Sequence, residues 1–245
     1  MNRFYHSKPI NINETIIMDN FAAHHAIKVM RIKKDDKLIL FNGDGSDYQG
    51  QVININNKNV EVLINSKEII NNESGLKVTL LQALTSSDKM DWIIQKTTEL
   101  GISCIQPLVC ERSTVKIKND KIEKRLFHWQ QVSIAACEQC GRSKIPGINK
   151  PENFTKCLDQ IKVSDKSLKI ILSPSAQKTI NDINYNSEQN IKVLIGPEGD
   201  FSKQEREFAI KQDFIPIKIG PRILRTETAP ITILSILQNL YGDIV

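Results

Sequence analysis

The residues best suited to chemistry lie near the C-terminal end of this 245-residue chain, after two short apolar runs. The first run ends within residues 194–199 (LIGPEG), in which two glycines flank a proline and a glutamate. Glycine lets a backbone approach a ligand closely, and proline fixes the bend of the chain. Because ligands of open α/β sheets bind where strands end, this segment is suited to be a binding loop. The same pattern also fits an ordinary turn between a strand and a helix.

A second segment, residues 217–229 (IKIGPRILRTETA), repeats the Gly-Pro ending and adds charged side chains. Arg222, Arg225 and Glu227 stand close together before the last predicted helix. An arginine can stabilise negative charge that develops in a reaction, and a carboxylate can orient an arginine or accept a proton. An alternative is that Arg225 and Glu227 form an ion pair that only braces the loop. Two Gly-Pro strand ends in one sheet favour a ligand site at their common edge.

Other chemistries are disfavoured by the motifs. The sequence has no G-x-x-x-x-G-K-[ST] segment, and the glycines at 43–50 lie between predicted strands, so nucleoside triphosphate and dinucleotide binding are not expected. Cys137 and Cys140 form a lone C-x-x-C pair, and with four scattered histidines we expect no metal site. Glu138 and Arg142, beside this pair, are better candidates for chemistry. The five cysteines are an odd set, and we expect reduced thiols.

Composition and charge point to a globular protein with a basic region. Hydrophobic residues make up 40% of the chain and charged residues 25%, which are ordinary globular values. No apolar stretch approaches the roughly 20 residues of a membrane span, and no signal-peptide core follows the first residues, so we expect a soluble, cytoplasmic protein. Residues 112–150 hold nine basic and three acidic residues, a local charge of +6 against +5 for the whole chain. This excess fits either an RNA-binding surface or a solvated helix face.

The apolar periodicity changes at a polar stretch, residues 71–75. Before it, β-branched runs and tight-turn dipeptides predict a small β-rich module. After it, apolar runs alternate with helical periodicity, which predicts one α/β domain with buried parallel strands. The predicted strands are 37–41, 48–55, 59–64, 78–84, 102–109, 168–172, 192–195 and one that reaches Ile219. The predicted helices are 20–30, 88–100, 120–140, one beginning near 151, one opened by a capping box at 202–205, and 231–241.

Two of the predicted helices carry an apolar face. The helix at 88–100 is expected to bury Trp92, Ile93 and Leu100. The last helix has an apolar stripe broader than one face of a terminal helix needs, which suits burial in a subunit contact. Its members are Ile231, Leu234, Ile236, Leu237 and Leu240.

Short motifs in order along the chain carry a family resemblance. They are LQAL (81–84), DKM (88–90), KTTELG (96–101), ERS (111–113), ACEQCGR (136–142), IGPEG (195–199) and IGPRILRTETA (219–229), together with residues 24–31 and FNG (41–43). With these motifs the chain resembles the bacterial 16S ribosomal RNA uridine-N3 methyltransferases of the SPOUT superfamily, over nearly its whole length.

The resemblance implies an α/β fold in two domains. A PUA-like RNA-binding β-barrel is expected over residues 1–72 and a SPOUT methyltransferase domain over residues 73–245. The resemblance further implies a trefoil knot near the C-terminus, which no residue pattern predicts and which chain topology in general disfavours. It also implies a cytoplasmic homodimer joined through the last helix, with a role in rRNA processing and ribosome biogenesis.

The implied methyl donor is S-adenosyl-L-methionine, held by the loops at the strand ends. Two positions depart from the family pattern: Asp200 stands where another small residue is usual, and Pro230 where a helix-forming residue is commoner. Aspartate tolerates the left-handed backbone moderately well, and proline is accepted in a first helical turn. By resemblance, the cofactor-binding residues are Leu172, Ser173, Gly196, Pro197, Glu198, Gly199, Ile219, Gly220, Ile223, Leu224 and Thr226.

The implied substrate is a uridine in 16S ribosomal RNA of the small ribosomal subunit. The catalytic candidates are Arg225, Glu227, Arg222, Glu138 and Arg142, and the expected RNA contacts are Arg3, His24, Arg31, Arg112, Lys116 and Arg142. One alternative is a non-catalytic RNA-binding ribosome-assembly factor, against which the intact Gly-Pro-Glu-Gly and arginine-containing segments argue. Another is a SPOUT methyltransferase that acts on tRNA, which fits the loops but not the first domain.

Overall fold

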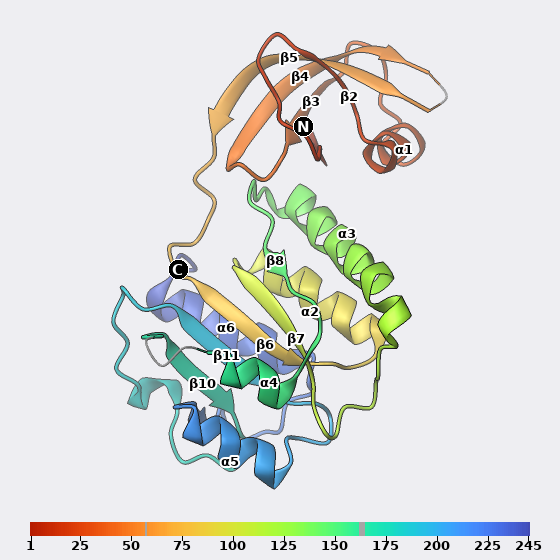
Figure 1. The fold of residues 1–245 in the computed structure, drawn as a ribbon. Helices are drawn as coiled ribbons and strands as arrows, with labels where there is room; N and C mark the ends of the chain where they lie inside the picture. Colours follow the sequence, from red (N-terminus) through yellow and green to blue (C-terminus); the bar gives the residue numbers. More distant parts are fainter. Residues whose placement is uncertain (57, 162–164) are drawn as a thin grey trace. The chain divides into compact units, whose positions relative to one another are not determined.

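The computed structural model describes residues 1–56, 58–161 and 165–245, which divide into two compact units (Figure 1). The first unit comprises residues 1–73 and 134–145, and the second comprises residues 74–133 and 146–245. Residues 134–145 therefore pack with the N-terminal unit although they lie far from it in the sequence. The ranges 1–72 and 73–245, as an RNA-binding and a catalytic domain, stay a prediction.

The first unit is built on a five-stranded sheet with the strand order β1-β3-β4-β5-β2. Its core forms because the strands bury alternate residues, such as Val60, Val62 and Ile64, and helix α1 adds its alanines. The expected tight turn is present, with Gly43 and Gly45 at positive φ. Closure into a barrel stays a prediction. The elements are β1 Asn2–Tyr5, β2 Thr15–Ile17, α1 Asn20–Lys28, β3 Lys37–Phe41, β4 Ser46–Ile55 and β5 Val60–Ile69.

The second unit holds a seven-stranded sheet with the order β12-β10-β11-β6-β7-β8, and β9 also pairs with β7. All of its strand pairs are parallel, as the buried apolar runs predict. The strands are β6 Val78–Ala83, β7 Cys104–Val109, β8 Gly147–Ile148, β9 Glu152–Asn153, β10 Leu168–Leu172, β11 Ile191–Ile195 and β12 Ile215–Ile217.

Helices cover both faces of this sheet (Figure 1). Strand residues alternate between two cores: Leu80 and Ile170 pack with α2, α3 and α6, whereas Leu81 and Ile171 pack with α4 and α5. The helices are α2 Ser87–Glu99, α3 Ile122–Cys140, α4 Phe154–Asp159, α5 Lys203–Lys211 and α6 Thr228–Tyr241, with short 3-10 turns at Asn119–Lys121 and Ile180–Asp182. None of the helices in the described residues is long and apolar enough to cross a membrane.

Local sequence signals set several helix ends. Gly101 and Gly141 adopt positive φ just after α2 and α3, a backbone conformation that glycine adopts at lower energy than residues with a Cβ. The capping box of α5 is complete: Glu205 N donates to Ser202 Oγ and Ser202 N donates to Glu205 Oε2. Pro230 lies in the first turn of α6, where its missing N–H costs little.

Three expectations about the second unit are wrong in detail. Strand β12 ends at Ile217, before the predicted Ile219, so the Gly-Pro segment begins a longer loop. The helix expected near 151 begins at Phe154, after the short strand β9. Trp92 is half exposed rather than buried, and the ammonium of Lys96 lies 5.1 Å from its ring centre. An aromatic beside an apolar stripe matches helical periodicity even when it faces solvent.

A buried amide joins α6 to the start of this unit and gives a test of its packing. Gln238 donates to the carbonyl of Leu100 at 2.9 Å and accepts from the hydroxyl of Ser74 at 2.7 Å. We expect Gln238→Ala to lower the free energy of unfolding by about 2 to 3 kcal/mol, because two buried polar groups lose their partner and a cavity is left. Both tryptophans of the chain, Trp92 and Trp129, lie in this unit, so urea unfolding followed by tryptophan fluorescence measures it directly.

The control for this prediction is Asn239→Ala, which changes the neighbouring exposed amide. Its effect is expected to stay within about 0.5 kcal/mol. Equal losses in the two variants would contradict the role given to Gln238.

Candidate functional site

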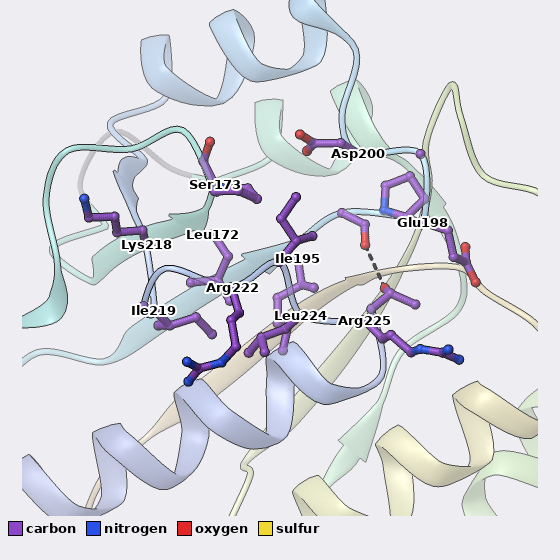
Figure 2. A pocket seen from close by; sticks show the side chains of 18 of the residues that line it. Leu172, Ser173, Ile195, Glu198, Asp200, Lys218, Ile219, Arg222, Leu224 and Arg225 are labelled. Atoms are coloured by element: carbon purple, nitrogen blue, oxygen red, sulfur yellow. Dashed lines mark hydrogen bonds between the residues drawn. The ribbon is translucent and has the colours of Figure 1, made fainter.

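Three loops of the second unit meet at one edge of the sheet. Strand β10 pairs in parallel with both β11 and β12, so the loops that follow Leu172, Ile195 and Ile217 leave the sheet at the same edge. Together with the N-terminal turns of α2 and α6 they enclose a cavity of about 650 Å³ (Figure 2). The cavity is lined by Lys89, Leu172, Ser173, Pro174, Ile195, Gly196, Pro197, Glu198, Gly199, Asp200, Ile217, Lys218, Ile219, Gly220, Arg222, Ile223, Leu224, Arg225, Thr226 and Ala229.

The two Gly-Pro segments contact each other inside this edge. The hydroxyl of Thr226 donates to the carbonyl of Gly196 at 2.8 Å, the dashed line in Figure 2. A Cβ at Gly196 would lie 3.2 Å from the ring of Phe201, and Gly220 has φ +103, so both positions favour glycine. Asp200 adopts φ 58, the left-handed conformation that its side chain was expected to tolerate.

One side of the pocket carries two exposed arginines. Arg222 and Arg225 extend from the loop that leads into α6, and Figure 2 shows their guanidinium groups pointing apart. Neither guanidinium has a hydrogen bond or ion pair within the described residues. Both therefore remain available to an anionic group in or above the pocket.

The acidic side of the pocket is organised by Lys89, in the first turn of α2. Its Nζ lies 3.0 Å from Glu198 Oε1 and 3.4 Å from Glu227 Oε2. The hydroxyl of Thr85 also donates to Glu198. Glu227 thus pairs with Lys89, and the ion pair between Arg225 and Glu227 weighed from the sequence is not formed.

These contacts shift the pKa values of both partners in opposite directions. Burial acts to raise the pKa of Glu198, but the hydrogen bonds from Thr85 and Lys89 outweigh it and hold that pKa below its usual value. The hydrogen bond to Glu198 raises the pKa of Lys89. The ion pair is therefore fully charged at neutral pH, and its contribution to stability is lost as the pH falls through the lowered pKa of Glu198.

All of the residues predicted to bind the cofactor line this pocket. Of the catalytic candidates, Arg222 and Arg225 also line it, and Glu227 lies beside Lys89. Glu138 and Arg142 belong to the first unit instead. Their roles in catalysis stay predictions, as do the roles of the lining residues.

Three arginines of the first unit were expected to bind RNA, and two of them, Arg3 and Arg142, are largely buried and have protein partners. The guanidinium of Arg142 donates to Glu73 at 2.7 Å, and its residue is 5% exposed. Arg3 pairs with Asp47 and donates to the carbonyl of Arg142 at 3.0 Å. These bonds hold residues 134–145 against the N-terminal sheet, which is a structural task. Isolated arginines carry no sequence signal that separates such a task from RNA binding.

Glu138 is also engaged within the first unit. Its carboxylate accepts from the backbone N–H of Tyr5 at 3.0 Å and lies 4.0 Å from Nδ1 of His25. Burial raises the pKa of Glu138, against the lowering effect of the Tyr5 hydrogen bond. The carboxylate therefore already has a structural partner.

The remaining expected RNA contacts are exposed. His24 and Arg31 lie at the surface of the first unit, on and just after α1, and Lys116 lies at the surface of the second. Arg112 is exposed too, but its guanidinium donates to the carbonyl of Gly199 at 3.1 Å and so supports a pocket loop. Their contact with RNA stays a prediction.

Sequence reasoning missed Lys89, Lys218 and Asp200 as lining residues. Lys89 was identifiable, because it lies in the first turn of α2, the helix that follows β6, and β6 ends at the same edge as β11. Arg206, on α5, was also missed although it bonds Ser173 and Asp200. Its partners are 33 and 6 residues away, and no motif connects them.

The described residues contain no group of three or more His, Cys, Asp or Glu side chains that could hold a metal ion. All five cysteines are free thiols. Burial raises the pKa of Cys137 to about 12, so this member of the C-x-x-C pair stays protonated at neutral pH.

Two family models match the chain. An RNA methyltransferase domain covers residues 72–238, and an RNA methyltransferase PUA domain covers residues 21–65. The first match alone spans more than half of the chain. The chain belongs to this RNA methyltransferase family. The resemblance drawn from the short motifs is thereby confirmed.

Relatives of the family match over nearly the whole chain. The ribosomal RNA small subunit methyltransferase E of Buchnera aphidicola (subspecies Schizaphis graminum) is 39% identical over 99% of this chain and 97% of its own length. A Legionella pneumophila protein described as a methyltransferase, solved with the bound cofactor SAM, is 37% identical with a TM-score of 0.94 over 99% of this chain and 98% of that chain. The ribosomal RNA small subunit methyltransferase E of Neisseria gonorrhoeae, solved bound to S-adenosyl methionine, is 32% identical with a TM-score of 0.92 over the full length of both chains.

The ion-pair network around Lys89 gives a pH test of the site. In Lys89→Met the carboxylate of Glu198 loses a hydrogen bond and a neighbouring positive charge, so its pKa should rise toward the ordinary value for glutamate. Carboxyl carbon shifts in an NMR titration measure that pKa directly. The control is Lys96→Met, which removes a cation from the same helix. Among the acidic residues described, Lys96 pairs only with Glu99, so this variant should leave the pKa of Glu198 unchanged. An unchanged Glu198 titration in Lys89→Met would contradict the network.

Proposed function

We propose that this protein transfers the methyl group of S-adenosyl-L-methionine to N3 of a uridine in 16S ribosomal RNA of the small ribosomal subunit. The observation that carries the proposal is the cavity where both Gly-Pro loops and the end of β10 meet. The two solved relatives at 37% and 32% identity hold SAM, and their folds match this chain almost completely. The curated relative at 39% identity is a ribosomal RNA small subunit enzyme.

The residues of the pocket fit this cofactor. The cavity of about 650 Å³ is within the usual range for a ligand of drug-like size. Leu172, Ile195 and Leu224 offer apolar surface to an adenine ring, and Gly196 and Gly220 leave backbone groups accessible. Bound SAM would supply an activated methyl group on a positively charged sulfur. The chain itself must hold the target base against that group.

The chemistry at the base requires N3 to lose a proton, because neutral uracil N3 is a poor nucleophile. As the N–C bond forms, the S–C bond breaks and its electron pair stays on sulfur. Negative charge that develops on the uracil oxygens needs a cation, and Arg225 or Arg222 can supply it because neither is paired within the described residues. Glu227, already held by Lys89, is the pocket's candidate to orient the base or to accept the proton.

The finer structural expectations belong to the same proposal. We propose the trefoil knot in the second unit, the RNA-binding role of the PUA domain and a cytoplasmic site of action. We also propose a homodimer through α6. Its support is the apolar surface that α6 leaves uncovered, where Ile231 and Ile236 are half-buried and Leu240 is 45% exposed.

The function is tested by calorimetry with SAM followed by transfer of a labelled methyl group. Small ribosomal subunits, free ribosomal RNA and tRNA are compared as acceptors, and the product is digested to nucleosides. We expect binding with a 1:1 stoichiometry per chain and label in 3-methyluridine from the small-subunit RNA. Failure to bind SAM, or label only in a ribose or in tRNA, would overturn the proposal.

The place of binding is tested by filling the pocket. Gly196→Val puts side-chain bulk against the Phe201 ring and into the cavity, and Leu224→Trp fills it from the opposite loop without strain at a glycine. Both should abolish calorimetric binding while the chain stays folded. Ile210→Trp, at a half-exposed position of α5 outside the lining, is the control and should bind as the parent does.

Arg225 separates an enzyme from a binding protein. If its guanidinium stabilises the charge that develops during transfer, Arg225→Ala should lower turnover about 100-fold, comparable with the loss of one oxyanion donor. SAM affinity should change little. If Arg225 only contacts a phosphate, RNA affinity falls and its salt dependence flattens by about one unit while turnover at saturation is kept. Normal saturated turnover in Arg225→Ala would contradict the catalytic role.

The subunit contact is tested by light scattering. We expect twice the chain mass of 27.8 kDa for the parent protein at micromolar concentration. Leu240→Glu should shift the mass toward the monomer, because a charge in an apolar contact is costly. A monomeric parent protein would refute the homodimer.

A further inference from the structure

Hydrogen bonds from one arginine outside the pocket lining join two of the pocket's loops. Arg206 does not line the cavity, but its Nη1 donates to Ser173 Oγ at 2.8 Å and to Ser175 Oγ at 3.2 Å, and its Nη2 donates to Asp200 Oδ2 at 2.7 Å. Ser173 and Ser175 belong to the loop after β10, whereas Asp200 belongs to the loop after β11. Figure 2 shows Ser173 and Asp200 at the same end of the pocket. We call these four residues the loop clasp.

The arginine of the loop clasp stands on a fixed base. It lies in the first half of α5, whose N-terminus is held by the complete capping box of Ser202 and Glu205. Glu205 also accepts from the backbone N–H of Glu111 at 2.8 Å. Phe201, just before the helix, is 2% exposed and packs against Phe154. A guanidinium on such a base can set the position of two loops rather than follow them.

The aspartate of the clasp is placed by its backbone. Asp200 adopts φ 58, a conformation that favours glycine, and its N–H donates to the carbonyl of Pro197 at 3.0 Å. Its Oδ1 accepts from the N–H of Phe201 at 2.7 Å, which leaves Oδ2 for Arg206. The left-handed backbone is energetically unfavourable for a residue with a Cβ, and these bonds offset that cost. By the resemblance drawn from the motifs, a small residue was expected at the position of Asp200.

We infer that Arg206 is a positioning residue that, through Asp200 and Ser173, holds two cofactor loops at the spacing that the methyl donor needs. The inference rests on the proposed function of this pocket. Ser173 is 4% exposed and lines the cavity, so its hydroxyl position decides the shape of that wall. When loops are ordered before the ligand arrives, binding no longer includes the entropic cost of ordering them. The loop clasp therefore raises the affinity for the cofactor and does not change the rate of the chemical step.

The test uses the full chain with three variants at the clasp. Arg206→Met removes the guanidinium and keeps much of the aliphatic stem. Asp200→Gly removes the acceptor and relaxes the backbone at φ 58. The double variant completes the cycle. Lys203→Met is the matched control, since it removes a cation from the same helix. The only described acidic partner of Lys203 is Glu207, which lies outside the pocket lining.

Three readouts are measured. Amide hydrogen exchange in the free protein reports the order of residues 173–176 and 196–201 without any ligand. Calorimetry with SAM reports affinity, and methyl transfer at saturating SAM reports turnover. If only about a tenth of the chains keep the loops in the competent arrangement, the apparent Kd rises about tenfold.

We expect faster exchange in both loops and an approximately tenfold weaker Kd in Arg206→Met and in Asp200→Gly, with the double variant little worse than either and turnover at saturating SAM preserved. Lys203→Met should match the parent protein. A lower melting temperature with unchanged exchange and unchanged Kd would make Arg206 a structural residue only and overturn the inference. If the parent protein does not bind SAM, the proposed function fails, whereas loop exchange in the free variants still decides whether the loop clasp exists.

Discussion

The parallel pairing of β10 with β11 and β12 is the constraint on which the site depends. Parallel strands end at one edge of a sheet, so loops separated by more than 20 residues in the sequence must gather there. Burial on both faces explains why these strands are apolar throughout, and it fixes their register against α2, α4, α5 and α6. The bond from Thr226 to Gly196 then joins the two Gly-Pro loops across the edge. The pocket is thus a consequence of topology before any functional side chain is considered.

The charged side chains around the pocket fall into two groups, those that form ion pairs with each other and those without a charged partner among the described residues. Lys89 balances Glu198 and Glu227, so both carboxylates are held in place, and the lowered pKa of Glu198 keeps that carboxylate ionised at neutral pH. Arg222 and Arg225 have no such partner among the described residues. A partly exposed ion pair holds its two groups near each other, whereas an unpaired exposed guanidinium can change partners during a reaction. Under the proposed function, this division suits the carboxylate side to positioning or proton transfer and the arginine side to a transient negative charge.

The sequence predicts what depends on local pattern and misses what depends on distant partners. Strand 168–172, the capping box at 202–205 and the meeting of the two Gly-Pro segments follow from periodicity, turn chemistry and parallel-sheet topology. The contacts of Lys89 with Glu198 and Glu227 join residues more than 100 positions apart, and no pattern announces them. Arg3 and Arg142 fit an RNA-binding role in the sequence, because the sequence does not show that Asp47 and Glu73 are their partners. The same reason hid the packing of residues 134–145 with the first unit.

The central claim is that the cavity at the carboxyl edge of the sheet holds the methyl donor. A crystal structure of the full chain grown in saturating SAM tests it most directly. The account predicts electron density for adenosine and the methionyl group between Leu172, Gly196 and Leu224, with Arg225 at the open side of the site. Density for SAM at another place on the chain, or a cavity that stays empty while calorimetry under the same conditions shows binding, would contradict it.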